Sequence, residues 1–355
     1  MNQKRIRDYG ITIGSYPTGN RNAITDIEGV NVGHCTIDTD SHKTGVTVIK
    51  PSKENIFTNK LIAASYVLNG FGKTIGLMQI DELGTLESPI ALTNTLNVGL
   101  ISDALVSYTI KECKKENVPV TSFNPVVGEC NDSSLNFIEE RAVKERHVLH
   151  ALETTSIDFD QGDVGAGKGT ICFGFKGGIG SSSRIITIGE KEYHIGVLVQ
   201  SNFGKTKDLV INGMAFGKTL HDKLVPSVTD KGSIISVIAT DLPLSARQLK
   251  RLLKRAAMGL GRCGSHIGHG SGDIMIGFST ANVVKHGQED AISTFQCINE
   301  NHLDGPFHAV IEAEEEAILN SMIAADTVVG HNGEIRYGLG PFLKEYLTKN
   351  NIVND

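Results

Sequence analysis

The sequence contains no tryptophan, and aromatic residues make up only 6% of its 355 positions. Proteins that stack sugars or bases depend on such side chains, so the scarcity disfavours both functions. Basic residues are not in surplus either, because 34 Lys and Arg stand against 40 Asp and Glu. A chain with a formal charge of −6 lacks the positive surface that binds a phosphate backbone, so no nucleic-acid partner is expected.

Long apolar runs are also missing. The longest uncharged stretch, around Ile90, is interrupted by Pro89 and by polar residues between Thr93 and Asn97, so it does not form a membrane span of about 20 apolar residues. No apolar signal segment follows the charged residues at the N-terminus. The six cysteines include no C-x-x-C pair and are spaced neither as a zinc site nor as a disulfide framework. These absences favour a cytoplasmic protein without membrane contact.

Glycine and short β-branched runs are what the sequence has in plenty. The 39 glycines indicate many tight turns and close backbone approaches. The length allows two domains or one large layered fold, and the alternation of strand-like and helical patterns favours an α/β architecture. The expected strands are Gly45–Lys50, Gly196–Gln200, Ser233–Thr240 and Asp273–Thr280, and the expected helices are Val98–Cys113, Ser134–Leu149, Ser245–Leu260 and Pro306–Ala325.

One segment of 28 residues, Lys205–Gly232, shows neither the hydrophobic period of a helix nor that of a strand. Connections of that length without regular structure are often functional. The segment ends at Gly232-Ser233, where the serine opens a predicted strand. Glycine permits the strained backbone that brings a serine oxygen onto the preceding carbonyl carbon. An acyl shift followed by hydrolysis would release Ser233 with an α-amine able to act as base for its own hydroxyl. The alternative is an ordinary turn before a strand.

Two glycine-rich segments suggest other chemistry. Gly162–Thr170 superficially resembles a phosphate-binding loop, but Lys168 is followed by Gly169, which places the hydroxyl of Thr170 one position late. The alternative is a tight turn packed closely against other backbone.

The second segment contains His266, His269 and Asp273, which invite a metal interpretation. The histidine spacing is not that of a helical ligand pair and no third ligand is evident, so no metal is expected. Another interpretation is that Ser271 and Asp273 support a neighbouring nucleophile, because residues i and i+2 of a strand share one face.

Motifs spread over nearly the whole chain occur in a characteristic order. They are Asp8–Ile11, Pro17–Gly19, Asn22–Asp26, Gly29–His34, Pro125–Glu129, Gly162–Thr170, Ser201–Gly204, Gly232–Pro243, Gly270–Asp273 and Phe278–Thr280. In these motifs the chain resembles the self-processing serine aminopeptidases, the family of the L-aminopeptidase/D-alanyl-esterase-amidases and the β-aminopeptidases.

The resemblance implies an architecture and a processing event. The fold would be a four-layer αββα sandwich of the N-terminal-nucleophile-like kind, related to the ornithine acetyltransferases. Residues 1–355 would form one catalytic domain that cleaves itself into an α chain, 1–232, and a β chain, 233–355. The family implies no cofactor, and its members assemble as homo-oligomers of four or more subunits.

The resemblance also implies roles for individual residues. Ser233 would be the nucleophile, Asn202 would stabilise the oxyanion, and Ser271 with Asp273 would orient Ser233 and its amine. Glu129 would hold the ammonium group of the substrate. Some relatives carry tyrosine just beyond this glutamate, where this chain has Cys130-Asn131. The resemblance to those relatives therefore does not assign the pocket shape or the second oxyanion donor of this chain.

The expected function is hydrolysis of amino-terminal residues from small peptides, amides or esters that carry a free amine. One alternative is an uncleaved, catalytically silent protein that binds small molecules. Another is acyl transfer on the same fold, although ornithine acetyltransferases use a threonine nucleophile and Ser233 argues against that assignment.

Overall fold

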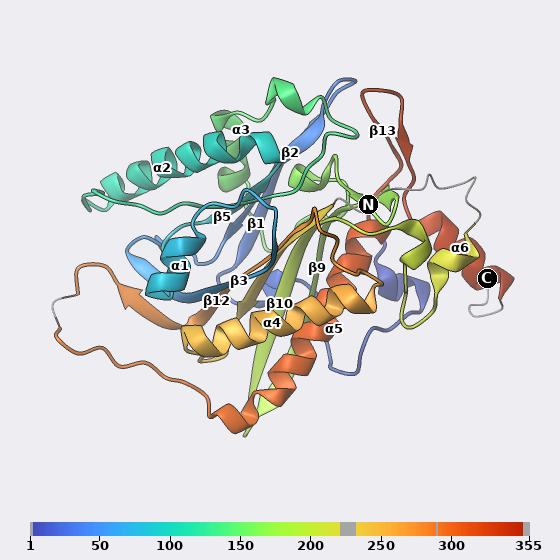
Figure 1. Ribbon diagram of the computed structural model, residues 1–355. Coiled ribbons are helices and arrows are strands. Elements are labelled where there is room, and N and C mark those ends of the chain that lie inside the picture. The colour runs from blue at the N-terminus through green and yellow to red at the C-terminus, as the bar shows by residue number, and fades with distance from the viewer. Residues whose placement is uncertain (1–2, 221–231, 289, 351–355) are drawn as a thin grey trace.

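Two mixed β-sheets form the centre of the molecule (Figure 1). The computed structural model describes residues 3–220, 232–288 and 290–350. The four-stranded sheet has the order β1 (Asn31–Asp38), β2 (Lys43–Lys50), β5 (Ile90–Thr93) and β6 (Val126–Glu129). The six-stranded sheet has the order β4 (Thr85–Leu86), β3 (Asn59–Gly70), β12 (Gly272–Lys285), β11 (Ser233–Thr240), β10 (Lys191–Asn202) and β9 (Gly178–Ile188).

Smaller elements complete the described chain. Two short hairpins pair β7 (Ile171–Cys172) with β8 (Phe175–Lys176) and β13 (Val328–Val329) with β14 (Ile335–Arg336). The α-helices are α1 (Leu77–Leu83), α2 (Val98–Lys115), α3 (Glu145–Glu153), α4 (Ala246–Arg262), α5 (Asp304–Ile323) and α6 (Gly340–Lys349). Single 3₁₀ turns span Ile6–Tyr9, Ile24–Asp26, Thr95–Asn97, Ile138–Glu140, Gly165–Gly167, Thr206–Asp208, Phe216–Thr219 and Glu300–His302.

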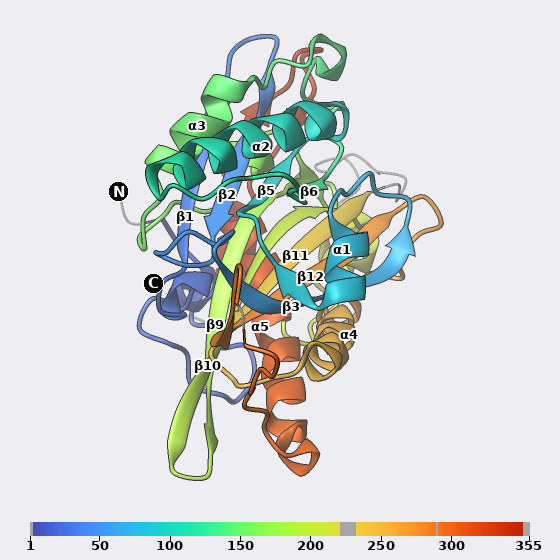
Figure 2. The ribbon, with the colours of Figure 1, turned by 90° about the vertical axis from the view of Figure 1, so that its left-hand side faces the viewer.

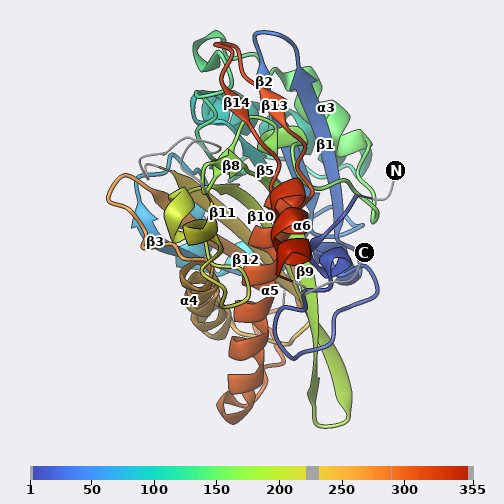
Figure 3. The same cartoon turned by 90° about the vertical axis from the view of Figure 1, so that its right-hand side faces the viewer.

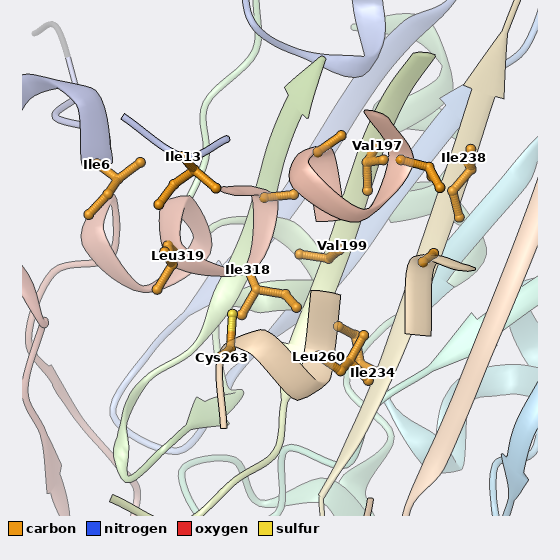
Figure 4. Close-up of a cluster of buried hydrophobic side chains, with 14 of the residues drawn as sticks. Ile6, Ile13, Val197, Val199, Ile234, Ile238, Leu260, Cys263, Ile318 and Leu319 are labelled. Atoms are coloured by element: carbon orange, nitrogen blue, oxygen red, sulfur yellow. The ribbon is translucent and has the colours of Figure 1, made fainter. Parts of the chain in front are cut away.

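Helices cover the outer face of each sheet. Helices α2 and α3 lie on the four-stranded sheet (Figure 2), where Ile101 and Leu105 share an apolar cluster with Val46 and Val48 of β2. Helices α4 and α5 lie on the six-stranded sheet, where Leu260 and Ile318 meet strand residues such as Val199 (Figure 4). The sequence prediction of a layered α/β fold is confirmed at this level.

Of the two remaining helices, α1 packs against β3, and α6 extends the cluster on the six-stranded sheet. Its side chains Leu343 and Leu347 are buried in that cluster, and the Leu339 N–H that precedes the helix donates to the carbonyl oxygen of Met322 near the end of α5 (Figure 3). The C-terminal segment is therefore fastened to the same core as α4 and α5.

Strand β11 shows why a continuous apolar run becomes a central strand. All eight of its residues are buried. Ile234 and Ile238 point toward α4 and α5, whereas Ile235 and Val237 lie in the cluster between the two sheets. Because alternate residues face opposite sides, a strand covered on both faces is mostly apolar, and its inner polar residue Ser236 is hydrogen-bonded to Glu314. Its serine at the first position stands out against this background.

The predicted strands are all present, and β11 has the predicted bounds Ser233–Thr240. The predicted helix Ser245–Leu260 is α4, and the Ser245 hydroxyl accepts the Gln248 N–H as an N-cap. Pro306–Ala325 is largely α5, which starts slightly earlier. Helix α4 follows from local pattern because its apolar stripe matches its burial, whereas α5 is buried on nearly all sides, its glutamates included.

The predicted helix Ser134–Leu149 is wrong up to Lys144 and right only from Glu145 onward. The chain instead makes a 3₁₀ turn at Ile138–Glu140, and α3 begins only at Glu145. Arg141 has a positive φ of 48° and Lys144 is extended, so the backbone between the two pieces is not helical. The conformations of these two residues interrupt the single helix that the sequence pattern predicts.

The segment Lys205–Gly232 keeps its irregular character where it is described. Residues 205–220 contain the 3₁₀ turns Thr206–Asp208 and Phe216–Thr219, and residues 221–231 lie outside the described part of the chain. Among the helices that the structure describes, none combines the length and apolar character that crossing a bilayer requires.

Candidate active site

A cleft of about 890 Å³ opens where strands of both sheets meet. Strand β10 ends there at Asn202, paired with Ser233 at the start of β11, and Ile234 pairs with Asp273 at the start of β12. The cleft is lined by Phe71, Lys73, Thr95, Glu129, Asn131, Ser133, Ser134, Ile171, Asn202, Phe203, Gly204, Gly232, Ser233, His269 and Gly270. The predicted residues Glu129, Asn202, Gly232 and Ser233 therefore share one cavity.

Ser233 is 8% exposed and lies at the floor of this cleft. Its Oγ accepts a hydrogen bond from the Gly272 N–H at 3.1 Å. A Cβ at Gly272 would lie 2.7 Å from Gly72 Cα and 3.3 Å from Ser233 Oγ. Glycine at 272 thus lets two loops and the serine hydroxyl approach each other closely.

Gly232 precedes the serine in an equally confined place. A Cβ there would lie 1.8 Å from the carbonyl oxygen of Asn202, closer than any side chain tolerates. The requirement for glycine comes from this backbone approach, which brings the Gly232–Ser233 peptide against the end of β10.

Ser271 and Asp273 are buried next to the start of β11 and are not among the residues that line the cleft. Their exposed fractions are 1% and 2%, and Ser271 Oγ lies 2.5 Å from Asp273 Oδ2. The Asn69 side-chain amide donates to both the carbonyl and the hydroxyl oxygen of Ser271. The strand register places this buried carboxylate beside Ile234, the second residue of β11, and the support of Ser233 by Ser271 and Asp273 stays a prediction.

The amide of Asn202 has a fixed orientation. Its Oδ1 accepts the Ile171 N–H at 2.9 Å. Because the amide group is planar, Nδ2 is directed away from Ile171. Asn202 lines the cleft, so this amino group is a candidate hydrogen-bond donor beside Ser233.

Glu129 places a buried carboxylate at the other wall. It is the last residue of β6 and is 2% exposed. The Lys73 N–H donates to Oε1 at 3.0 Å and the Thr95 hydroxyl donates to Oε2. Within residues 3–220, 232–288 and 290–350, no cationic side chain forms an ion pair with it. The Lys73 ammonium instead donates to the Phe71 carbonyl at 2.7 Å.

A backbone contact links Glu129 to the serine. Gly72 lies between them, since a Cβ at Gly72 would be 3.8 Å from Glu129 Oε1 and 3.7 Å from Gly272 Cα. Gly72 thus lies near both the Glu129 carboxylate and the Gly272 backbone, whose N–H donates to Ser233 Oγ.

Cys130 and Asn131 occupy the positions where the sequence departs from its relatives. Cys130 is fully buried, and its thiol donates to the carbonyl oxygens of Gln200 at 3.3 Å and Ser233 at 3.5 Å. Burial raises the pKa of this thiol well above its usual range. Cys130 is thus a neutral contact beneath the serine, while Asn131 lines the cleft.

The phosphate-loop interpretation of Gly162–Thr170 is not supported by the contacts of its lysine. Lys168 Nζ is paired with Asp38 at 2.7 Å and with Asp163 at 2.8 Å. A Cβ at Gly167 would lie 2.5 Å from the Ile179 nitrogen. The segment is a closely packed turn between the two sheets.

The two histidines of the second glycine-rich segment lie in different places. His269 lines the cleft, whereas His266 lines a separate cavity with Lys207 and Asp208. Across the described part of the chain, no group of three or more His, Cys, Asp and Glu side chains could hold a metal ion.

Several site residues were not predicted from the sequence. Thr95, Ile171, Gly72 and Gly272 contact the predicted residues through hydrogen bonds or close backbone packing. Thr95 carried a signal, because it is a polar break in an otherwise apolar stretch. The contact of Gly72 with Gly272 joins positions 200 residues apart and leaves no local trace.

Comparisons with known proteins find peptidases and aminopeptidases. A family model described as peptidase family S58 matches residues 22–336. A β-peptidyl aminopeptidase from Sphingosinicella xenopeptidilytica is 36% identical over 94% of this chain and 88% of its own length. A solved protein from Pyrococcus horikoshii OT3 is 44% identical, with a TM-score of 0.92 over 98% of this chain and 99% of the other. The L-aminopeptidase D-Ala-esterase/amidase from Ochrobactrum anthropi, described as a prototype serine aminopeptidase and an Ntn hydrolase variant, is 34% identical, with a TM-score of 0.90 over 98% and 99% of the two chains.

Proposed function

The chain belongs to peptidase family S58 and is a serine aminopeptidase of the Ntn type. We propose that Ser233 is its nucleophile and that it hydrolyses amino-terminal residues of small peptides, amides or esters. The observation that carries this assignment is that the Ser233 hydroxyl and the buried Glu129 carboxylate line the same cleft. Glu129 receives only neutral donors from the described residues. A substrate ammonium would supply the missing positive charge, since an unpaired buried carboxylate is costly.

In the proposed mechanism, binding of the ammonium at Glu129 places the first carbonyl carbon of the substrate over Ser233 Oγ. The hydroxyl transfers its proton to the α-amine of Ser233 and attacks the carbonyl. The leaving amine or alcohol takes up a proton, and water then hydrolyses the acyl-enzyme by the reverse roles.

Asn202 Nδ2 stabilises the negative charge that develops on the substrate oxygen. A donor fixed in advance by its own hydrogen bond, here from Ile171 N–H to Oδ1, needs no reorganisation during the reaction. The buried Ser271–Asp273 pair holds the amine of Ser233 in position and favours its protonated form after attack.

The α-amine arises from self-cleavage at Gly232–Ser233 into chains 1–232 and 233–355. The confined packing of Gly232 against the backbone carbonyl of Asn202 supports this step, because it keeps the peptide beside the residue whose side-chain amide is the proposed donor. The architecture behind it is proposed to be a four-layer αββα sandwich forming one domain, related to the ornithine acetyltransferases. We further propose a cytoplasmic homo-oligomer of four or more subunits that needs no cofactor.

Replacing the serine tests both steps. Ser233→Ala should give one chain near 38.2 kDa on a denaturing gel, without activity on aminoacyl p-nitroanilides, because neither attack can occur. The matched control is Ser236→Ala on the same strand, whose hydroxyl bonds to Glu314 on the opposite face. This control should yield two chains and activity. An active Ser233→Ala protein would refute the mechanism, and an inactive, uncleaved wild type would favour the silent binding protein instead.

A further inference from the structure

A fully buried lysine lies behind the proposed oxyanion donor. Lys176 of β8 has an exposed fraction of 0%. Its Nζ donates to three carbonyl oxygens, those of Gly167 at 3.0 Å, Thr170 at 2.5 Å and Gly177 at 2.9 Å. The three hydrogens of an ammonium group match three acceptors.

Burial of this ammonium has a cost that the fold alone does not require. Desolvation lowers the pKa of Lys176 to about 7. Its hydrogen-bond partners among the described residues are backbone carbonyls, with the Asp163 and Asp132 carboxylates acting only through space. An apolar side chain of similar length would avoid the desolvation cost of a buried charge. The role of Lys176 is therefore expected to lie in its three hydrogen bonds, which an apolar side chain would not make.

What the lysine secures is the hairpin that holds Asn202. Thr170 O, which accepts from Lys176 Nζ, also accepts the Gly177 N–H at 3.0 Å. The next residue, Ile171, pairs with Lys176 across the β7–β8 hairpin and donates its N–H to Asn202 Oδ1. The Phe173 N–H fastens the turn of the same hairpin to the Phe203 carbonyl at 2.7 Å. The Ile171 N–H is thus held in place by the hairpin, to which Lys176 contributes through the Thr170 carbonyl and its pairing with Ile171.

We propose that Lys176 is a positioning residue for the oxyanion donor: by tying Gly167, Thr170 and Gly177 together it fixes the Ile171 N–H, which holds Asn202 with Nδ2 directed into the cleft. This inference rests on the proposed role of Asn202. When Lys176 is replaced, the amide gains freedom to turn, so transition-state stabilisation weakens. The substrate amine is still held at Glu129, on the other wall.

A double-mutant cycle tests the proposal with wild type, Lys176→Met, Asn202→Ala and the double variant. Processing is allowed to proceed to completion, and kcat and KM for one aminoacyl p-nitroanilide are expressed per mole of chain beginning at Ser233. Lys176→Met should lower kcat about 10- to 100-fold with KM changed less than about threefold, a smaller loss than removing the donor itself. In the Asn202→Ala background it should have almost no further effect.

Lys168→Met is the matched control. It removes a partly buried lysine from the same turn, but one that pairs with Asp38 and Asp163 and not with the Thr170 carbonyl. It should lower Tm and leave kcat unchanged. If Lys176→Met yields too little processed enzyme, the rate of self-cleavage of the purified precursors is compared across the same four proteins.

The outcomes separate the two claims. Wild-type activity in Asn202→Ala would refute the role of Asn202, and the inference with it. A low activity of Asn202→Ala that Lys176→Met lowers by the same factor as in wild type would overturn the inference alone. A fully active Lys176→Met enzyme would also overturn it.

Discussion

At the scale of single residues, Glu129 is proposed to bind the substrate amine and to take no part in breaking the bond. Glu129→Gln keeps the shape and removes the charge. Losing a charge-assisted hydrogen bond in a buried site should cost about 1.5–3 kcal/mol, or about 10- to 150-fold in kcat/KM. Self-cleavage should continue, because the Gly232–Ser233 peptide presents no free ammonium. The measurement is kcat/KM for one aminoacyl p-nitroanilide, free and N-acetylated.

The matched control for this substitution is Glu87→Gln. Glu87 is also buried, at 5% exposure, but it pairs with Lys60 and Asn124 away from the cleft. Wild type should strongly prefer the free amine over the acetylated substrate, Glu87→Gln should keep that preference, and Glu129→Gln should reduce it. An unchanged preference in Glu129→Gln would show that this carboxylate does not recognise the amine.

Single residues also show how far the sequence could predict the site. Ser233 and Gly232 could be found because a glycine–serine pair ends an irregular segment and begins an apolar strand. Asn202 could be placed at a strand end, and the structure puts it there. Ile171 could not be found, because its contribution is a backbone N–H that any residue except proline possesses. Lys176 could not be found either, because only the fold reveals its burial.

At the scale of elements, α5 and β11 meet through a buried acid that gives a pH-dependent stability. Glu314 is fully buried, accepts the Ser236 hydroxyl, and has its pKa raised from its ordinary value near 4.5 to about 8 by burial. The folded state therefore holds this proton more tightly than the unfolded chain. The stabilising contribution is complete below about pH 4.5 and is lost as pH rises through about 8, with a slope of at most ~1.4 kcal/mol per pH unit.

Glu314→Gln should remove this slope, because the amide mimics the protonated acid at every pH. The comparison is best made in the uncleaved Ser233→Ala protein, where a single chain unfolds. Urea unfolding at pH 5, 6, 7 and 8 should show the variant gaining on its parent as pH rises. The difference between the two proteins cancels other groups, including His34, whose pKa burial lowers to about 4. Parallel curves would mean that Glu314 stays charged in the folded state.

Elements also differ in how well the sequence predicted them. Strand β11 and helix α4 could be predicted because burial follows a local period in both. Strands β5 and β6 have four residues each and give no comparable signal, yet β6 delivers Glu129 to the site. The pairing of two sheets depends on contacts between distant segments, which no local period encodes. The resemblance to a family supplied that information.

At the scale of the whole molecule, self-cleavage would leave two chains that both contribute strands to the six-stranded sheet. Strand β11 of the 233–355 chain pairs with β10 of the 1–232 chain along eight residues. Strand β12 of the same chain pairs with β3, and α5 packs on β9 and β10. Separating the chains would expose the face of β11 that lies toward the four-stranded sheet and the apolar cluster beneath α5, a loss of buried surface that two independent chains could not replace.

We therefore expect the processed chains to behave as one folding unit. Native size-exclusion chromatography followed by denaturing electrophoresis should find both chains in one peak, at equal molar amounts. Urea should abolish activity and release the chains in the same transition, since no part of the six-stranded sheet persists without the other chain. The uncleaved Ser233→Ala protein is the control, and it should elute with the processed enzyme because the contacts are the same. Release of either chain at urea concentrations that leave the other folded would show that the sheet is not shared in this way, and that residues 1–232 and 233–355 form separately stable units.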